Sequence, residues 1–428
     1  MAYSNLLKPD EPGTLLVEKV CTRLRRRQIV GSHNIALETA QLIYAIVRVV
    51  KFSTLDELLA LLKLIGRRLN EANPKELASG NIVRRILRLF REEYRAAAAT
   101  QITQPSTPLS GPETPGLHAP SSHYLSQDLS MTTTPPRTQN HSPNLGGTST
   151  LPVPSRAPSL SNFVAFRHSR AQLERSGSTL SELTQAAASI ENEEFMRQSA
   201  KLKPIFIQAI EEVIGELETT HDDVAKGARE HIHSAEVIMT LGHSKTVETF
   251  IKHAYRDRKF TVIVVESAPS YLGHTMAKSL SASNIPTILI PDSSVHALMP
   301  RVTKVVLGAH SILANGGLFA LSGTLSACLA AKAFSKPVVV TTGQFKFAPV
   351  WNLYHEHGAV DFQSPGNVLG YEGDGSAGGI TGVTTNAPYY EYIRPELINL
   401  FVTNEGDHSP SYIYRIIKEA YDEEDVEL

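Results

Sequence analysis

The chain has 428 residues, of which 42% are hydrophobic and 20% are charged, and its formal net charge is -2. This composition is that of a globular protein, and the length predicts two ordered domains. The small net charge excludes a global attraction to nucleic acid or to an anionic membrane. Two cysteines, Cys21 and Cys328, exclude a disulfide framework and favour a reducing compartment.

The sequence offers neither a secretory signal at its start nor an apolar stretch of the ~20 residues that a membrane span requires. We therefore expect a cytosolic protein without a membrane partner. Residues 1–97 hold 17 Lys and Arg against 10 Asp and Glu, a local excess of seven positive charges. Five of the last seven residues of the sequence are acidic: Asp422, Glu423, Glu424, Asp425 and Glu427.

Helices are predicted in the first hundred residues. Between Leu55 and Leu69, apolar residues recur at the spacing of one helical face. Thr54 precedes this segment and Glu57 follows three residues later, which predicts a capping box at the start of the helix. A further helix is predicted over 79–97.

The helix predicted over 79–97 carries arginines on the surface that its apolar stripe leaves free. Four of them are candidates for contact with a partner: Arg84, Arg85, Arg88 and Arg91. Such a group suits an acidic or phosphorylated protein, and the alternative is a solvated helix face. Because no exposed aromatic residues are interleaved with these arginines, we expect no direct contact with nucleic acid.

Composition divides the chain into four segments. We predict the first part of a helical domain over 1–100, a disordered Ser/Thr/Pro-rich insertion over 101–165 and the second part of the helical domain over 166–232. The insertion is too poor in apolar residues to offset the backbone entropy that folding removes. Residues 233–428 are predicted to form an α/β domain that mediates oligomerisation.

Residues 233–428 alternate between short apolar runs and helical segments. The runs rich in β-branched residues lie at 237–239, 262–265, 288–290, 305–307 and 338–340. Helices are expected at 244–257, 270–283, 319–334 and 410–421. Apolar strands separated by helices are typical of parallel strands that are covered on both faces. The predicted fold class is therefore α/β, with a helical domain followed by a doubly wound, Rossmann-like, mostly parallel sheet.

Motifs for common cofactors and metals are not found. No G-x-G-x-x-G motif opens a helix after a strand, and no phosphate-binding G-x-x-x-x-G-K-[ST] motif is present. His231 and His233 cannot share a helical face, so we expect no metal site and no cofactor. His243, Ser244 and His274 are better placed, because they follow strands at the edge where doubly wound sheets bind ligands.

Six short motifs in fixed order carry a resemblance to a known family. They are IMTLG (238–242), ESAP (266–269), GAHSILANG (308–316), NAP (386–388), PELI (395–398) and PSYIYR (410–415). In these motifs the chain resembles the family shared by the alpha, beta and delta subunits of translation initiation factor 2B and by ribose-phosphate isomerases. The resemblance covers nearly all of 15–97 and 200–428.

The resemblance implies an isomerase pocket that has lost its chemistry. The isomerases place a cysteine where this chain has Gly242 and an aspartate where it has His310, a pair that supplies an acid and a base. Their phosphate-binding arginines correspond to Val30 and Ala268. Asn315 is retained, either as a pocket residue or simply to hold a tight turn. On this comparison we expect no enzyme activity.

The resemblance also implies a role in translation. Initiation factor 2B exchanges guanine nucleotide on initiation factor 2, and its alpha, beta and delta subunits form the regulatory core. We expect partners among its alpha, gamma, delta and epsilon subunits, and the alpha subunit of initiation factor 2, phosphorylated or not. Two alternatives remain open on the same fold: an active sugar-phosphate isomerase, and a homo-oligomer that senses a metabolite.

Tyrosines late in the sequence are candidates for the contact between subunits: Tyr389, Tyr390, Tyr412 and Tyr414. Exposed tyrosines beside apolar residues are common at the centre of protein interfaces. The alternative is that they pack within the chain's own core.

Overall fold

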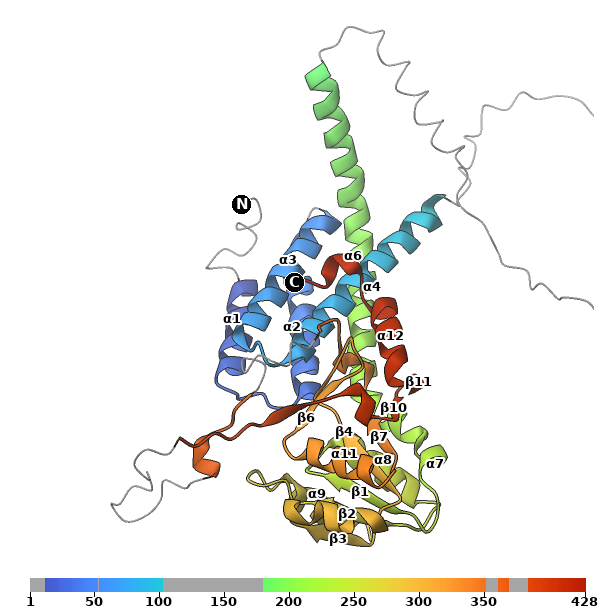
Figure 1. The fold of residues 1–428 in the computed structure, drawn as a ribbon. Helices are drawn as coiled ribbons and strands as arrows, with labels where there is room; N and C mark the ends of the chain where they lie inside the picture. Colours follow the sequence, from blue (N-terminus) through green and yellow to red (C-terminus); the bar gives the residue numbers. More distant parts are fainter. Residues whose placement is uncertain (1–11, 53, 103–179, 352–360, 369–383) are drawn as a thin grey trace, which may run out of the picture. The chain divides into compact units, whose positions relative to one another are not determined.

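The computed structural model describes residues 12–52, 54–102, 180–351, 361–368 and 384–428 (Figure 1). Two compact units are distinguished, Met1–Thr103 with Ile190–Leu428, and Gln104–Ser189. Because 103–179 lie outside the described residues, so does nearly all of the insertion predicted over 101–165.

Helices on both sides of the insertion share one core. They are α1 (Pro12–Arg25), α2 (Ser32–Val49), α3 (Leu55–Ala72), α4 (Leu77–Ile102) and α6 (Leu180–Lys226). The rings of Phe90 and Phe206 stack with centroids 4.4 Å apart, so α4 packs directly on α6. The predicted cap of α3 is confirmed, since the Thr54 hydroxyl accepts a hydrogen bond from the Glu57 amide at 3.2 Å.

A seven-stranded sheet forms the centre of the α/β part, with strand order β11-β10-β7-β4-β1-β2-β3. Its strands are β1 (Val237–Leu241), β2 (Thr261–Val265), β3 (Thr287–Ile290), β4 (Lys304–Gly308), β7 (Val338–Thr341), β10 (Leu400–Thr403) and β11 (Gly406–His408). All neighbours pair in parallel except β10 and β11. A short helix, α7 (Ala228–His231), leads into β1.

Both faces of this sheet are covered. Alternate strand residues contribute to two separate cores, one with helices α8 (Lys245–Tyr255) and α9 (Leu272–Ala282), the other with α10 (Val295–Leu298), α11 (Thr324–Ala333) and α12 (Ile413–Ala420). This arrangement confirms the predicted fold class. No helix in the described part of the chain is both long enough and apolar enough to cross a membrane.

A second, smaller sheet was not predicted from the sequence. Its four strands, in the order β8-β5-β6-β9, are β5 (Ser311–Leu313), β6 (Leu318–Leu321), β8 (Phe347–Ala348) and β9 (Tyr390–Ile393). The helix predicted over 319–334 is therefore wrong at its start: residues 318–321 form β6, and α11 begins only at Thr324. Gly323, at φ +97°, turns the chain between them.

Candidate functional site

The turn after β1 is closely packed. Gly242 has φ +64°, a conformation that favours glycine. A Cβ at this position would lie 2.6 Å from Cδ1 of Leu321. A side chain at Gly242 would therefore have to displace Leu321 and accept backbone strain.

The space from Gly242 toward His310 is filled by a pair of residues from the second sheet. Leu321 of β6 and Tyr390 of β9 are direct register partners, so their side chains lie on the same face. The His310 ring stacks on Tyr390 with centroids 3.8 Å apart and an interplanar angle of 17°. Contacts thus run from Gly242 through Leu321 and Tyr390 to His310, and the predicted pocket positions are linked by packed side chains.

The start of α11 is occupied by a carboxylate of the chain itself. Oε1 of Glu391 accepts a hydrogen bond from the Leu325 amide at 2.6 Å. Burial raises the pKa of this carboxyl, and hydrogen bonds from the backbone at 323–325 oppose that rise. A helix N-terminus at the ligand edge of a sheet is a ready site for phosphate. Here Glu391 fills it.

Two of the predicted pocket residues follow β1 but face different neighbours. His243 Nε2 lies 2.9 Å from Oε2 of Glu248 on α8. Ser244 packs against Gly308, where an added Cβ would lie 2.5 Å from the Ser244 hydroxyl oxygen. These contacts hold α8 against β4, and they do not direct either side chain to His310.

The remaining predicted pocket residues are held by local contacts. The Ala268 amide donates to Oδ2 of Asp292 at 2.7 Å, and the half-exposed His274 has its Nε2 3.5 Å from Oε2 of Glu266. Asn315 donates from Nδ2 to the Tyr392 hydroxyl at 2.7 Å and accepts from the Gly317 amide at 2.9 Å. The contacts of Asn315 fit the tight-turn interpretation.

His310 itself faces a cavity between the helical and α/β parts. The cavity measures about 130 Å³, and its lining also includes Val30, Gly31, Glu76 and Tyr390. His310 Nε2 lies 3.5 Å from Oε2 of Glu76, and both residues are buried. The structure thus brings Val30 and His310 to one cavity, while Gly242, Ala268 and His274 are not part of its lining. It is smaller than the roughly 300–1,000 Å³ of typical small-molecule pockets.

Lys346 is a buried cation that the sequence analysis missed. Its Nζ donates to the main-chain oxygen of Ala309 at 2.7 Å. Burial lowers the pKa of Lys346 to about 8, and the nearby Glu76 carboxylate opposes the shift. No motif surrounds this lysine in the sequence, and its burial accompanies the pairing of β8, which begins at the next residue, with β5, a long-range arrangement.

Arg84 and Arg91 are largely enclosed by the chain, so the expectation that the arginines of α4 stay at the surface is wrong for these two. Arg84 is only 5% exposed and donates to the main-chain oxygens of Asp425, at 3.1 Å, and Val426, at 3.0 Å. Arg91 bonds both carboxylate oxygens of Asp425 and also reaches Asp422 at 2.7 Å. The acidic C-terminal segment, residues 422–428, therefore packs on the basic helices α3 and α4 of the same chain.

Arg85 and Arg88 lie on another side of α4. Arg85 forms a two-point ion pair with Glu216 of α6, and Arg88 pairs with Glu92 one turn later at 2.7 Å. Both arginines line a cavity of about 400 Å³ between α4 and α12, which Tyr412 also lines. Two candidate groups that are far apart in the sequence are therefore neighbours.

The four candidate tyrosines divide into two pairs. Tyr389 and Tyr390 are partly buried and line the cavity beside His310, so the alternative of internal packing holds for them. Tyr412 and Tyr414 are exposed. Tyr414 adjoins Trp351, which is 59% exposed, with ring centroids 5.8 Å apart. Trp351 was not singled out from the sequence, although it is the sequence's single tryptophan and its type is common at interfaces.

Comparison with known proteins places this architecture in a family. Residues 28–410 match the initiation factor 2 subunit family. The chain is 37% identical over 409 residues to the translation initiation factor eIF2B subunit beta of Dictyostelium discoideum, which covers 96% of each chain. It is 33% identical over 425 residues to eIF2B subunit beta of Schizosaccharomyces pombe, which covers 96% of this chain and 97% of the relative.

A solved structure agrees at the level of the fold. A chain of the tetrameric eIF2B-beta2-delta2 complex from Chaetomium thermophilum superposes with a TM-score of 0.60 at 23% identity, covering 96% of each chain. The chain therefore belongs to the initiation factor 2 subunit family, and over nearly its whole length it is similar to eIF2B beta subunits.

Proposed function

We propose that the chain is a non-catalytic, regulatory subunit of the cytosolic exchange factor eIF2B. It binds the alpha, gamma, delta and epsilon subunits and the alpha subunit of initiation factor 2, and it responds to phosphorylation of the latter. The observation that carries the proposal is the 37% and 33% identity to eIF2B beta subunits over 96% of the chain. The solved relative assembles with delta subunits, which supports delta as a direct partner.

The packing at the edge of the sheet supports the absence of isomerase activity. Acid–base isomerisation needs titratable groups on both sides of a bound sugar phosphate. Gly242 offers none, and Leu321, whose cross-strand partner is Tyr390, fills the space beside it. Glu391 holds the helix terminus at which a phosphate could bind, and a second anion there would be repelled.

Contact with sister subunits is proposed for the Trp351 surface, which we define as Val350, Trp351, Tyr414 and Val426. All four side chains are more than a third exposed, and three of them line a cavity of about 190 Å³. Exposed aromatic residues around a small cavity suit the centre of an interface, where tryptophan and tyrosine contribute most to affinity. Burial in the assembly would remove this apolar area from water.

Contact with the alpha subunit of initiation factor 2 is proposed for the cavity between α4 and α12. Arg88 is the arginine best placed for it, because its partner Glu92 lies on the same helix and the pair is near solvent. A phosphoryl group carries up to two negative charges and attracts guanidinium more strongly than a single carboxylate does. Arg88 could therefore exchange Glu92 for a phosphorylated partner. Arg84 and Arg91 are excluded from this role by their internal contacts.

The proposal is tested by affinity capture of the tagged full chain from cells of its own source, followed by native mass spectrometry. We expect four other subunits in a two-fold assembly together with initiation factor 2. The variant Trp351→Ser should lose the sister subunits. The matched control is Leu15→Ser on α1, which also replaces an exposed apolar side chain and should retain them. A homo-oligomer that turns over an aldose phosphate would refute the proposal.

A further inference from the structure

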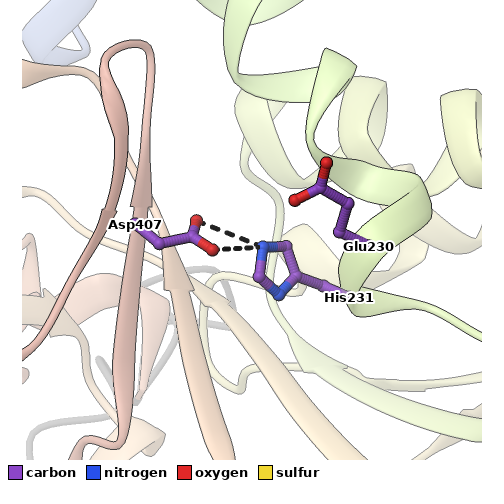
Figure 2. Close-up of side chains that lie close together, drawn as sticks. All are labelled: Glu230, His231 and Asp407. Carbon is purple, nitrogen blue, oxygen red and sulfur yellow. Dashed lines mark hydrogen bonds and ion pairs between the residues drawn. The ribbon is translucent and has the colours of Figure 1, made fainter. Parts of the chain in front are cut away.

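Three side chains that are unconnected in the sequence converge where α7 meets the edge of the large sheet. Glu230 and His231 belong to α7, and Asp407 belongs to β11 (Figure 2). His231 Nε2 lies 3.1 Å from Oδ1 and 3.0 Å from Oδ2 of Asp407. One nitrogen or oxygen atom from each of the three residues lies within 4.8 Å of those from the other two.

The donor atoms suit a transition-metal ion. One imidazole nitrogen and two carboxylate oxygens are ligands of Zn²⁺ in proteins, with bonds of about 2.1 Å, so that neighbouring ligands of a tetrahedral ion stand about 3.4 Å apart. The separations between His231 and Asp407 are slightly shorter than this, so an ion requires the Asp407 carboxylate to turn away from the imidazole nitrogen. Mg²⁺ and Ca²⁺ prefer oxygen ligands alone, and the imidazole disfavours them.

The neighbouring charges leave the two carboxylates uncompensated. Lys304 lies close by, but its Nζ bonds the main-chain oxygen of His231 and pairs with Glu236 at 3.6 Å. Arg229 pairs with Asp257 at 2.6 Å. In the described part of the chain, no basic side chain forms an ion pair with Glu230. A divalent cation would balance Glu230 and Asp407 together, whereas a protonated His231 would balance only one of them.

The histidine is held in place for this role. Its ring lies over Phe250 of α8, with centroids 6.3 Å apart and an interplanar angle of 24°. The His231 side chain is 13% exposed and that of Asp407 is 40% exposed, so an ion can enter and keep a water ligand. A mostly buried imidazole beside two exposed carboxylates limits the rearrangement that binding requires.

We propose that Glu230, His231 and Asp407 bind one first-row divalent metal ion, with Zn²⁺ as the preferred ion. The ion joins α7 to the antiparallel hairpin formed by β10 and β11, the edge of the sheet. Its role is structural, because residues 404–405 make only a tight turn between these strands and the edge strand β11 pairs on one side alone. Neither sequence motif nor spacing predicts the site, since 176 residues separate His231 from Asp407.

The experiment is a Zn²⁺ titration by calorimetry of the full chain in its assembly, after dialysis against a chelator. Wild type is compared with His231→Ala and with Asp407→Asn, which preserves the shape of the side chain. The matched control is His233→Ala, which removes a neighbouring histidine that contacts Arg258 at 3.2 Å. We expect both site variants to bind at least about tenfold more weakly at one site per chain, and His233→Ala to bind as wild type does.

A second measurement separates binding from misfolding. Co²⁺ replaces Zn²⁺ and reports its coordination by visible absorption, which should appear in wild type and disappear in Asp407→Asn, while the melting temperature of the metal-free proteins is the same. Equal stoichiometry in wild type and in both site variants would mean that the ion binds elsewhere and would overturn the proposal. So would the lack of any Zn²⁺ binding at micromolar concentration, which would leave His231 and Asp407 as an ordinary ion pair.

Discussion

Two sides of α4 use the same residue type in opposite ways. Arg84 and Arg91, seven residues apart on one side, are enclosed by residues 422–428 and satisfied by them. Arg85 and Arg88, three residues apart on another side, line a solvent-accessible cavity. The difference lies in the partner and not in the arginine, since Asp425 is fully buried while Glu92 is half exposed. A buried partner fixes an arginine as part of the fold, and an exposed one leaves it available for exchange.

The largest loss of stability is expected when the contacts that enclose Arg91 on α4 are removed. Asp425→Ala removes the carboxylate that pairs with Arg91 and with Lys63 at 2.8 Å. Because Asp425 is 0% exposed and Arg91 only 13% exposed, its loss removes an enclosed partner of Arg91, and we expect a loss of ~3 kcal/mol in the free energy of unfolding. Denaturant unfolding of the purified chain measures it. A loss no larger than that of Glu427→Ala, an acidic neighbour, would contradict the comparison.

Lowering the pH should remove the stabilisation that the Asp425 carboxylate provides. Burial alone would raise the pKa of Asp425, but hydrogen bonds from Arg91 and Lys63 outweigh it and lower the pKa. A carboxyl with a lowered pKa stabilises the fold above its unfolded pKa of about 3.9, and the contribution disappears as the pH falls through the folded pKa. The stability difference between wild type and Asp425→Asn should therefore be constant from pH 7 to 5 and shrink below about pH 4. A difference that persists at pH 2 would refute this account.

How much of this contrast can be predicted from the sequence depends on the range of the interactions. The cap at Thr54 and the parallel strands are predictable, because they depend on neighbours in the chain. The burial of Arg84 is not, since its partners are main-chain oxygens 341 and 342 residues away. The same holds at the candidate pocket: motif order identifies Gly242 and His310, but the pairing of Leu321 with Tyr390 that fills the space between them is long-range.

The start of α11 was predicted wrongly for the same reason, because a long-range interaction decides it. Residues 318–334 form one nearly continuous apolar run, which suits a helix and a buried strand equally. Pairing with β9, some seventy residues later, selects a strand for Leu318–Leu321. Glu391 in β9 then caps the helix that follows, at Leu325. Neither the pairing with β9 nor the cap by Glu391 can be predicted from the local sequence pattern.

A third prediction extends the comparison to the edge of the sheet, which is enclosed like the Arg84 side of α4. Gly242→Cys restores the residue type of the isomerases, but it places a Cβ 2.6 Å from Leu321 and a side chain at φ +64°. We expect a loss of ~2 kcal/mol in the free energy of unfolding, of which about 1–2 kcal/mol is backbone strain, and no turnover of an aldose phosphate.

The control for this variant is Gly242→Cys combined with Leu321→Ala, which removes the steric conflict and keeps the thiol. The double variant should show smaller additional destabilisation than the sum of the single changes, because the two residues are in contact. Isomerase activity in either variant would show that the pocket is intact and would break the comparison.

A smaller loss of stability is expected when Arg85 is replaced, because its burial is intermediate between that of Arg84 and that of Arg88. Its two-point pair with Glu216 joins α4 to α6, and both side chains are less than a third exposed. Arg85→Met keeps most of the apolar stem and removes the charge, so we expect a loss of ~1 kcal/mol. Hydrogen exchange of the α6 amides around Glu216 in the assembled complex measures the local opening. Unchanged exchange would place Arg85 with Arg88 as a surface residue.

The smallest effect on folding and the most specific effect on function are expected at Arg88. Its pair with Glu92 is of the i, i+4 type near solvent, and such pairs contribute about 0.3–0.5 kcal/mol. Arg88→Gln should therefore leave the melting temperature nearly unchanged. Under the proposed function it should weaken the response of nucleotide exchange to phosphorylated initiation factor 2 more than the response to the unphosphorylated form. Glu92→Gln is the informative partner variant, because freeing Arg88 should shift that balance in the opposite direction. If both variants behave as wild type in exchange and in inhibition, Arg88 is only solvated, and the cavity between α4 and α12 must contact initiation factor 2 through its tyrosine side or not at all.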